Sequence, residues 1–368
     1  MKHIVQNLEL LATGALRSDA LAIAEAGYAS INTDTVIRSK IHVTGDELKI
    51  ADTTYNIAGR RIFFVGVGKC AFAGAHAIEK LLGGTLTGGV ALDVASNTKH
   101  SFTMIEAFIG THPLPSEENV QASKRIVEFL SGLRESDLVI MLISGGGSTL
   151  LCYPDEPMSC EDESSLFHSL TARGASIQDI NTVRKHISKA RGGALAQAAY
   201  PAEVVSLIFS DVPGNDMRVI SSAPTVLDTS TVADALAVLT KYAVTPPANT
   251  TFIETPKEAK YFERVTNILF LTNRDALLAM QDEAEKRGYR TEIVDDHFKG
   301  EAREVGQSVL KKLQMSPANT ALLYAGESTV TISAEAGGLA SPERSEGGRN
   351  QEMALAVLEY LNPDELIL

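Results

Sequence analysis

A glycine turn that ends in a lysine is the first feature of this sequence that could do chemistry. Gly66 and Gly68 close an apolar run, Lys69 follows directly, and a helical pattern begins at once. An ammonium group at the start of a helix adds to the positive end of the helix dipole and suits a transferring phosphoryl group or an anionic substrate. The turn is not a Walker A loop, because Phe63 stands where that motif requires glycine. A glycine corner beside a solvated lysine is the alternative.

The same turn also has part of a dinucleotide-binding fingerprint. Ala71 occupies the place of the third small residue, and Asp93 ends the next apolar run. In that fingerprint the acidic residue binds the ribose of the cofactor. A nicotinamide-dependent reductase therefore stays open as an alternative function.

A second glycine-rich loop follows another apolar run and consists of Ser144, Gly145, Gly146, Gly147 and Ser148. Three adjacent glycines cost conformational entropy, so they indicate a place where the backbone N–H groups approach a ligand closely. The loop lacks the second half of a nucleophile elbow and does not indicate a hydrolase serine. We predict that this loop binds an anion.

A polar face on the helix predicted at 176–190 offers a third candidate site. Asn181, Arg184 and Lys185 lie three and four residues apart and share one side of the helix. Two cations and an amide suit an anion, which predicts contact with a substrate or a phosphate. A solvated helix face is the alternative.

Two aspartates and an arginine complete the set of candidates. Asp211 follows an apolar run and Asp216 lies beyond a Pro-Gly turn, where the pair could hold a hydrated Mg²⁺ at the carboxyl edge of a sheet. Ordinary turn chemistry also explains the Pro-Gly pair. Arg349 follows two glycines directly before a helix, a position from which it could reach into a cleft or remain a surface residue.

Short apolar runs alternate with helical patterns along most of the chain, and the first 35 residues predict helix. Strands interleaved with helices predict βαβ units and a parallel sheet covered on both faces, which is an α/β fold. The predicted strands are 61–67, 88–94, 105–110, 138–144, 204–210, 267–273, 290–295 and 320–326, and helices are predicted at 117–132, 176–190 and 274–287.

The length of 368 residues predicts two domains. A Pro- and Thr-rich stretch interrupts the alternation near residue 245, so we expect a Rossmann-like N-terminal domain at 1–245, a linker at 246–265 and a smaller domain at 266–368.

The composition limits the partners of the protein. A net charge of −13 argues against nucleic acid, since nucleic-acid binders carry a basic footprint. Three cysteines are too few for a disulfide framework and fit a reducing compartment. No apolar run approaches the roughly 20 residues of a membrane span. We expect a cytoplasmic protein without a membrane span, and the sequence allows a homodimer.

Six segments follow one another along nearly the whole chain. They are VGVGKCA, THPLPSEENV, LISGGGSTLL, RGASIQDINTVRKHISKARGGALA, LIFSDVPGNDMRVISSAPTVLD and GESTV with GGRNQEMALA. Taken in this order they resemble the class II glycerate 2-kinases with a C-terminal MOFRL domain. The resemblance implies transfer of the γ-phosphoryl group of ATP to the C2 hydroxyl of D-glycerate, with Mg²⁺. It also implies that Lys69 and Arg349 are the basic residues at the reacting phosphate.

The sequence departs from the family pattern in places. Ala223 stands where glycine is usual. The family continues beyond the helix that follows Arg349, so the resemblance implies an incomplete C-terminal domain of lower stability, and an inactive homologue is a further alternative.

Overall fold

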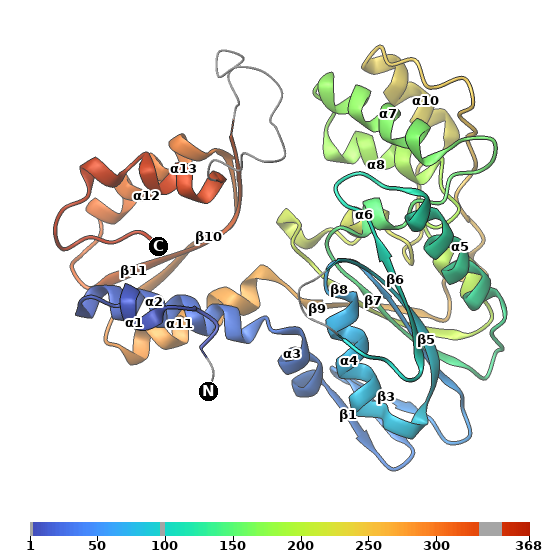
Figure 1. The fold of residues 1–368 in the computed structure, drawn as a ribbon, viewed down its shortest axis with the longest axis horizontal. Coiled ribbons are helices and arrows are strands. Elements are labelled where there is room, and N and C mark those ends of the chain that lie inside the picture. Colours follow the sequence, from blue (N-terminus) through green and yellow to red (C-terminus); the bar gives the residue numbers. More distant parts are fainter. Residues whose placement is uncertain (1–2, 96–99, 331–347) are drawn as a thin grey trace. The chain divides into compact units, whose positions relative to one another are not determined.

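The computed structural model describes residues 3–95, 100–330 and 348–368, which form two compact units. Unit 1 comprises residues 1–32 and 272–368, and unit 2 comprises residues 33–271 (Figure 1). This division differs from the expected one, because residues 1–32 pack with the C-terminal part of the chain. No helix within the described ranges is long and apolar enough to cross a membrane.

Unit 2 is built on a six-stranded parallel sheet with the order β6-β5-β4-β7-β8-β9. Numbered along the chain, this order is 3-2-1-4-5-6, the order of a doubly wound dinucleotide-binding sheet. The predicted α/β class is confirmed, and the strand order is consistent with a Rossmann-like unit. The strands are β4 Ile62–Val67, β5 Leu86–Val94, β6 Ile105–Gly110, β7 Leu138–Ile143, β8 Glu203–Phe209 and β9 Val265–Leu271.

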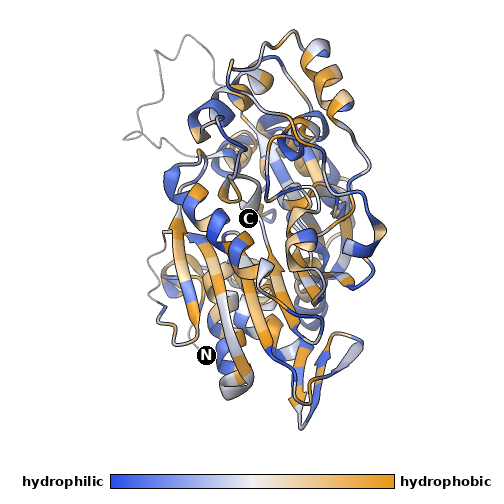
Figure 2. Cartoon of the chain, turned by 90° about the vertical axis from the view of Figure 1, so that its right-hand side faces the viewer, coloured by the Kyte–Doolittle hydropathy of each residue, from blue (hydrophilic) through white to orange (hydrophobic). Residues whose placement is uncertain are grey.

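The central strands are apolar on both faces because each face is covered. Every residue of β4 and β7 is buried, with Ile62 and Phe64 in one core and Phe63 and Val65 in the other. The strands of the sheet are coloured mainly as hydrophobic in Figure 2. The covering helices are α4 Ala71–Leu82 on the first face, and α5 Glu117–Ser131 and α9 Ala194–Ala199 on the second.

Unit 2 carries two additions to this sheet. The helix α3 leads into an antiparallel meander, and three further helices form a layer with a core of its own. The sequence did not predict the meander, because its strands have only four residues each. The meander consists of β1 Ile41–Thr44, β2 Glu47–Ile50 and β3 Thr53–Asn56 after α3 Thr33–Lys40, and the helical layer consists of α7 Cys160–Ala172, α8 Ile177–Lys185 and α10 Val232–Lys241.

Two predicted boundaries differ from the structure. The helix predicted at 176–190 ends at Lys185, because the chain then turns so that Ser188 forms a β-bridge with Pro154. The predicted linker 246–265 belongs to unit 2, where the Ile253 N–H donates to the His186 carbonyl at 2.8 Å. The chain passes between the units at residues 32–33 and 271–272 instead.

Unit 1 contains a parallel βαβ arrangement, in which α12 connects β10 to β11. Its core joins Ile23 from the beginning of the chain to Leu277 and Leu323. The helices α2 and α11 pack closely, since a Cβ on Gly27 would lie 2.8 Å from Met280 Cγ. The elements are α1 Leu8–Leu11, α2 Ala15–Ser30, α11 Asn273–Lys286, β10 Arg290–Glu301, α12 Ala302–Gln314, β11 Thr320–Thr329 and α13 Arg349–Leu355.

Candidate functional site

The two predicted glycine loops lie side by side at the carboxyl edge of the sheet of unit 2. They follow the neighbouring strands β4 and β7, where the strand order reverses and where open α/β sheets bind ligands. The Lys69 N–H donates to the Gly145 carbonyl at 3.0 Å, and the Ser144 N–H donates to the Val67 carbonyl at 2.9 Å. The structure therefore brings together two segments whose contacting residues are 76 and 77 positions apart in sequence.

The glycines are needed because neighbouring atoms occupy the space of a side chain. A Cβ on Gly68, whose φ is +115°, would lie 2.2 Å from the Ser144 Oγ. A Cβ on Gly145 would lie 2.3 Å from the Asp211 Oδ2. Among the backbone and side-chain hydrogen bonds of the described residues, none uses the N–H of Gly145 or Gly146. Two N–H groups are thus available to an anion.

A lysine and a histidine meet at Gly146. A Cβ on this glycine would lie 3.1 Å from both Cγ and Cε of Lys69 and 3.5 Å from Cδ2 of His112. Both side chains are exposed. Burial and the charge of Lys69 lower the pKa of His112 below its ordinary value, so the ring is neutral at pH 7. The sequence around His112 contains no ligand pattern and left both a packing position and a cleft position open, and its place after β6 assigns it to the same sheet edge.

The two predicted metal ligands have different surroundings. Asp211 is exposed and its carboxylate lies against Gly145, so it belongs to the same site as the glycine loops. Asp216 forms a bidentate pair with Arg218 at 2.8 and 2.9 Å, and this hydrogen bonding lowers the pKa of Asp216. One carboxylate beside bound phosphates fits Mg²⁺, which keeps several waters. The carboxylate of Asp211 therefore lies at the glycine-loop edge, whereas Asp216 has a partner in the protein.

A buried chain of hydroxyl groups links the second glycine loop to α8. The Ser222 Oγ lies 2.9 Å from both the Ser148 Oγ and the Asn181 Oδ1. Ser221, Ser222 and Ala223 all have positive φ, at 50°, 59° and 56°. This conformation costs free energy for residues with a side chain, so glycine, which the family resemblance leads us to expect at position 223, would adopt it at less cost than Ala223. Asn181 thus supports the loop through Ser222.

The two cations predicted on α8 have different surroundings. The Lys185 Nζ lies 2.6 Å from the Asp228 Oδ1, and Lys185 is 7% exposed. The Arg184 guanidinium stacks on Phe167 at 4.2 Å from the ring centre. Burial, and then the charge of Arg191, lowers the pKa of Arg184 to about 10. Lys185 is thus engaged by Asp228. Within the described ranges no hydrogen bond or ion pair engages the Arg184 guanidinium, whose Nε is buried, so the substrate contact of Arg184 stays a prediction.

Both carboxylate oxygens of Asp93 accept hydrogen bonds from the backbone, which argues against a role in cofactor binding. Its Oδ2 accepts a hydrogen bond from the Phe72 N–H at 2.9 Å, and its Oδ1 accepts one from the Val94 N–H at 2.7 Å. Burial raises the pKa of Asp93, which is 4% exposed. The carboxyl group caps the beginning of α4 and does not present a free oxygen to a ribose, as a nicotinamide-binding site requires.

Arg349 lies in unit 1, whereas Lys69 lies in unit 2. It is the first residue of α13, its side chain is exposed, and its Nη2 lies 2.5 Å from the Glu327 Oε1 on β11. Arg349 thus begins a helix and has a carboxylate as its partner, and its role at the reacting phosphate stays a prediction.

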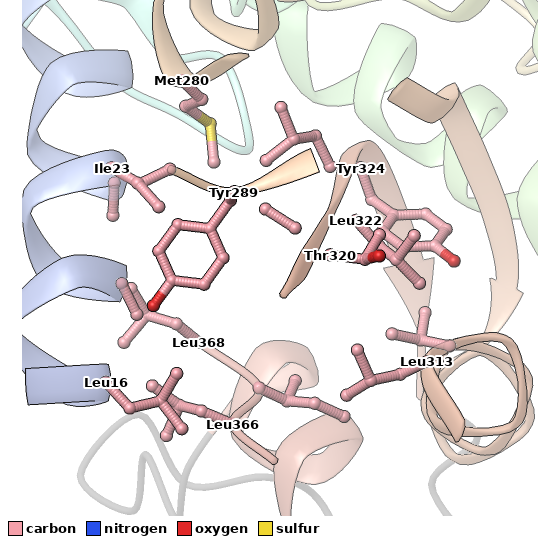
Figure 3. Close-up of a pocket in the computed structure, with 16 residues that line it drawn as sticks. Leu16, Ile23, Met280, Tyr289, Leu313, Thr320, Leu322, Tyr324, Leu366 and Leu368 are labelled. Atoms are coloured by element: carbon pink, nitrogen blue, oxygen red, sulfur yellow. The ribbon is translucent and has the colours of Figure 1, made fainter. Parts of the chain in front are cut away.

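Unit 1 also contains an apolar hollow of about 220 Å³. Figure 3 shows Ile23 and Leu16 of α2 on one side, with Leu366 and Leu368 below Tyr289. None of the lining residues is charged. This hollow therefore does not fit a nucleotide phosphate, and the candidate site is the glycine-loop edge of unit 2.

Comparison with known proteins places the chain among glycerate kinases. The domain family described as a domain of unknown function, DUF4147, matches residues 19–254. D-glycerate 2-kinase of Thermotoga maritima is 32% identical over 330 residues, which cover 87% of this chain and 76% of the relative. A protein of Agrobacterium vitis that is provisionally named a hydroxypyruvate reductase is 36% identical over 312 residues, or 81% of this chain and 68% of that protein.

The fold agrees with these relatives. The crystal structure of a glycerate kinase from Thermotoga maritima matches with a TM-score of 0.78 at 29% identity, covering 95% of this chain and 80% of that chain. The sequence match and the structural match point to the same proteins, so this chain belongs to the glycerate kinase family.

Proposed function

We propose that this protein transfers the γ-phosphoryl group of ATP to the C2 hydroxyl of D-glycerate and releases 2-phosphoglycerate. The observation that carries the proposal is the free N–H groups of Gly145 and Gly146 beside the exposed ammonium of Lys69. Phosphoryl transfer needs positioning and charge stabilisation more than covalent help from the protein, and this edge of the sheet supplies both. The relative from Thermotoga maritima carries the name of this reaction.

Each group at the edge has a role in this reaction. The glycine N–H groups bind phosphate oxygens, and Lys69 neutralises charge that develops on the transferred group. Mg²⁺ would be held by Asp211 and the ATP phosphates and would supply further charge neutralisation. Arg349 does not belong to this edge, since it lies in unit 1, and it is the second cation that the family resemblance implies. Arg349→Lys should lower turnover, since an ammonium does not replace a bidentate guanidinium.

The proposal includes three further expectations. Residues 266–368 are expected to form a MOFRL-like domain, the protein is expected to be cytoplasmic, and the sequence allows a homodimer. Free Cys70, Cys152 and Cys160 support a reducing compartment. Light scattering of the purified protein measures the oligomeric state.

The test is the identity of the product. The protein is incubated with D-glycerate and ATP–Mg²⁺, and ³¹P and ¹³C NMR identify the position of the new phosphate ester. We expect 2-phosphoglycerate and ADP in equal amounts. A phosphate ester at C3, or no ester from D-glycerate, would contradict the proposal.

A hydroxypyruvate reductase is the second candidate, supported by the provisional name of the Agrobacterium vitis relative. The capping task of Asp93 disfavours it. The two functions are separated by the cofactor that raises the melting temperature, since saturation at 100 times Kd stabilises by about 2.7 kcal/mol. We expect this shift with ATP–Mg²⁺ and none with NADH.

A further inference from the structure

The loop that carries His112 is fastened to the second glycine loop. Asn119 is fully buried and accepts a hydrogen bond from the Thr111 N–H at 2.8 Å. Its Nδ2 donates to the Thr111 carbonyl at 3.1 Å and to the Thr149 carbonyl at 3.2 Å. Thr149 also donates through Oγ1 to the Pro113 carbonyl at 3.4 Å. The backbone on both sides of His112 is thereby held against the helix that follows Gly146.

The imidazole itself is left without a protein partner at the site. Within the described ranges no hydrogen bond or ion pair involves either ring nitrogen of His112, and the residue is exposed. Its Cδ2 and the stem of Lys69 approach the same point beside Gly146. The backbone around His112 is held by hydrogen bonds and its ring nitrogens have no protein partner. The imidazole is therefore a proton acceptor next to the expected phosphate position.

We propose that His112 is the general base that accepts the proton of the attacking hydroxyl group. This inference rests on the proposed phosphoryl transfer. The hydroxyl oxygen forms its bond to the γ-phosphorus while the bond between that phosphorus and the leaving oxygen of ADP breaks, and the electron pair stays on ADP. The hydroxyl proton moves to an imidazole nitrogen and then to water.

The charges around the ring fit this task. Lys69 from the loop after β4 faces His112 and disfavours the imidazolium form. Asp211 from the loop after β8 lies against the adjoining Gly145. Since a base works in its unprotonated form, kcat/KM should rise with pH through the lowered pKa of His112 and be level at neutral pH.

The experiment compares wild type, His112→Asn and the control His42→Asn, whose histidine is exposed on β1. Transfer from ATP is measured from pH 4.5 to 9 with D-glycerate and a panel of small hydroxy acids. For His112→Asn we expect kcat to fall roughly 10²-fold, the KM for ATP to stay within about twofold and the acid limb of kcat/KM to disappear. Free imidazole should restore part of the activity of His112→Ala. The control should match wild type.

The outcomes separate this inference from the proposed function. Wild-type kinase activity on D-glycerate with an unchanged pH profile in His112→Asn would overturn the base role alone. A fall in kcat that leaves the acid limb intact, or a rise only in the KM for ATP, would also overturn it. Transfer to another hydroxy acid with loss of the acid limb would support the base and contradict the glycerate assignment. If the wild-type protein transfers phosphate to none of the acceptors, both the base role of His112 and the proposed kinase function are overturned.

Discussion

Lys69 and Lys185 carry the same side chain, and their surroundings give them opposite uses. Lys69 is exposed, and no carboxylate within the described ranges forms an ion pair with it. Lys185 is buried and its ammonium is neutralised by Asp228. An ammonium without a partner at a sheet edge can bind an incoming anion, whereas a buried pair stabilises the fold only if it stays intact.

Replacing Lys69 tests the first of these roles. Lys69→Met keeps the stem that packs beside Gly146 and removes the charge. We expect kcat to fall about 10²–10³-fold, because charge stabilisation in the transition state is lost, while the free energy of unfolding changes little. The measurement is steady-state phosphorylation together with urea unfolding. Lys80→Met, at an exposed position of α4, is the matched control and should be fully active.

Replacing Asp228 tests the second role. Its carboxylate accepts hydrogen bonds from Lys185 at 2.6 Å, Ser230 at 2.7 Å and Thr255 at 3.1 Å. Asp228→Asn leaves a buried unpaired ammonium, so we expect a loss of about 3–5 kcal/mol in the free energy of unfolding. The matched control Asp34→Asn breaks an exposed pair with Arg38 and should cost less than about 0.5 kcal/mol.

The pH dependence of the Asp228 effect has a definite sign. Burial alone would raise the pKa of Asp228, but the hydrogen bonds from Lys185 and Ser230 lower it below the value of about 3.9 in an unfolded chain. The carboxylate therefore stabilises the fold above the unfolded value, and this stability is lost as the pH falls through the folded value. Urea unfolding should show a wide gap between wild type and Asp228→Asn at pH 7 that narrows below pH 4. A gap that is constant with pH would contradict this account.

At the scale of elements, the sequence predicted the strands and loops whose structure depends on neighbouring residues in the chain. Long apolar runs predicted all six strands of the main sheet, because strands covered on both faces contain little else. Glycines at the strand ends predicted both loops, because a backbone that approaches other groups closely has no room for a side chain. The four-residue strands of the meander have no such signal, and the turn at Ser188 depends on its bridge to Pro154.

What sequence reasoning missed depends on contacts between distant elements. Lys185 looked available because Asp228 is 43 residues away in the chain. His112 had no motif, and its place beside Lys69 follows from the order of strands in the sheet. Local pattern therefore indicates which loops are candidates for binding, and the order of strands in the sheet determines which side chains lie beside them.

The close contact of the glycine loop with its neighbours can be tested with one methyl group. Gly145→Ala would place Cβ 2.3 Å from the Asp211 Oδ2, so the carboxylate or the loop must move. We expect kcat/KM to fall on the order of 10²-fold, since a shift of 1 Å can cost that much, and the apparent affinity for Mg²⁺ to weaken. Activity across a Mg²⁺ titration measures both effects.

Gly84→Ala is the matched control for this substitution. A Cβ there meets nothing within 4 Å and the backbone is not left-handed, so this variant should have wild-type kinetics. If Gly145→Ala also behaves as wild type, the loop does not position Asp211 for catalysis.

At the scale of the whole molecule, unit 1 is assembled from both ends of the described chain. The ion pair of Arg287 with Asp19 at 2.7 Å and the hydrogen bond from the Tyr289 hydroxyl group to Asp19 at 2.9 Å join these ends. Ile23 adds to the same core. Unit 2 is therefore an insertion between two segments that fold together, and it contains every strand of the main sheet.

This arrangement predicts where the chain can be cut. A fragment of residues 33–271 keeps the sheet and the three cores of unit 2, so we expect it to unfold in one cooperative transition. It should bind ATP–Mg²⁺ without kinase activity, because it lacks Arg349, the second cation proposed for the reaction. A fragment of residues 1–245 follows the boundary expected from sequence. It loses β9, uncovers the edge of β8 and leaves Ile23 without its partners on α11 and β11, so it should aggregate or lack cooperative unfolding. Circular dichroism melting and calorimetric ATP titration of both fragments make the comparison. Equal cooperativity in the two would show that the division at residues 33 and 271 does not govern folding.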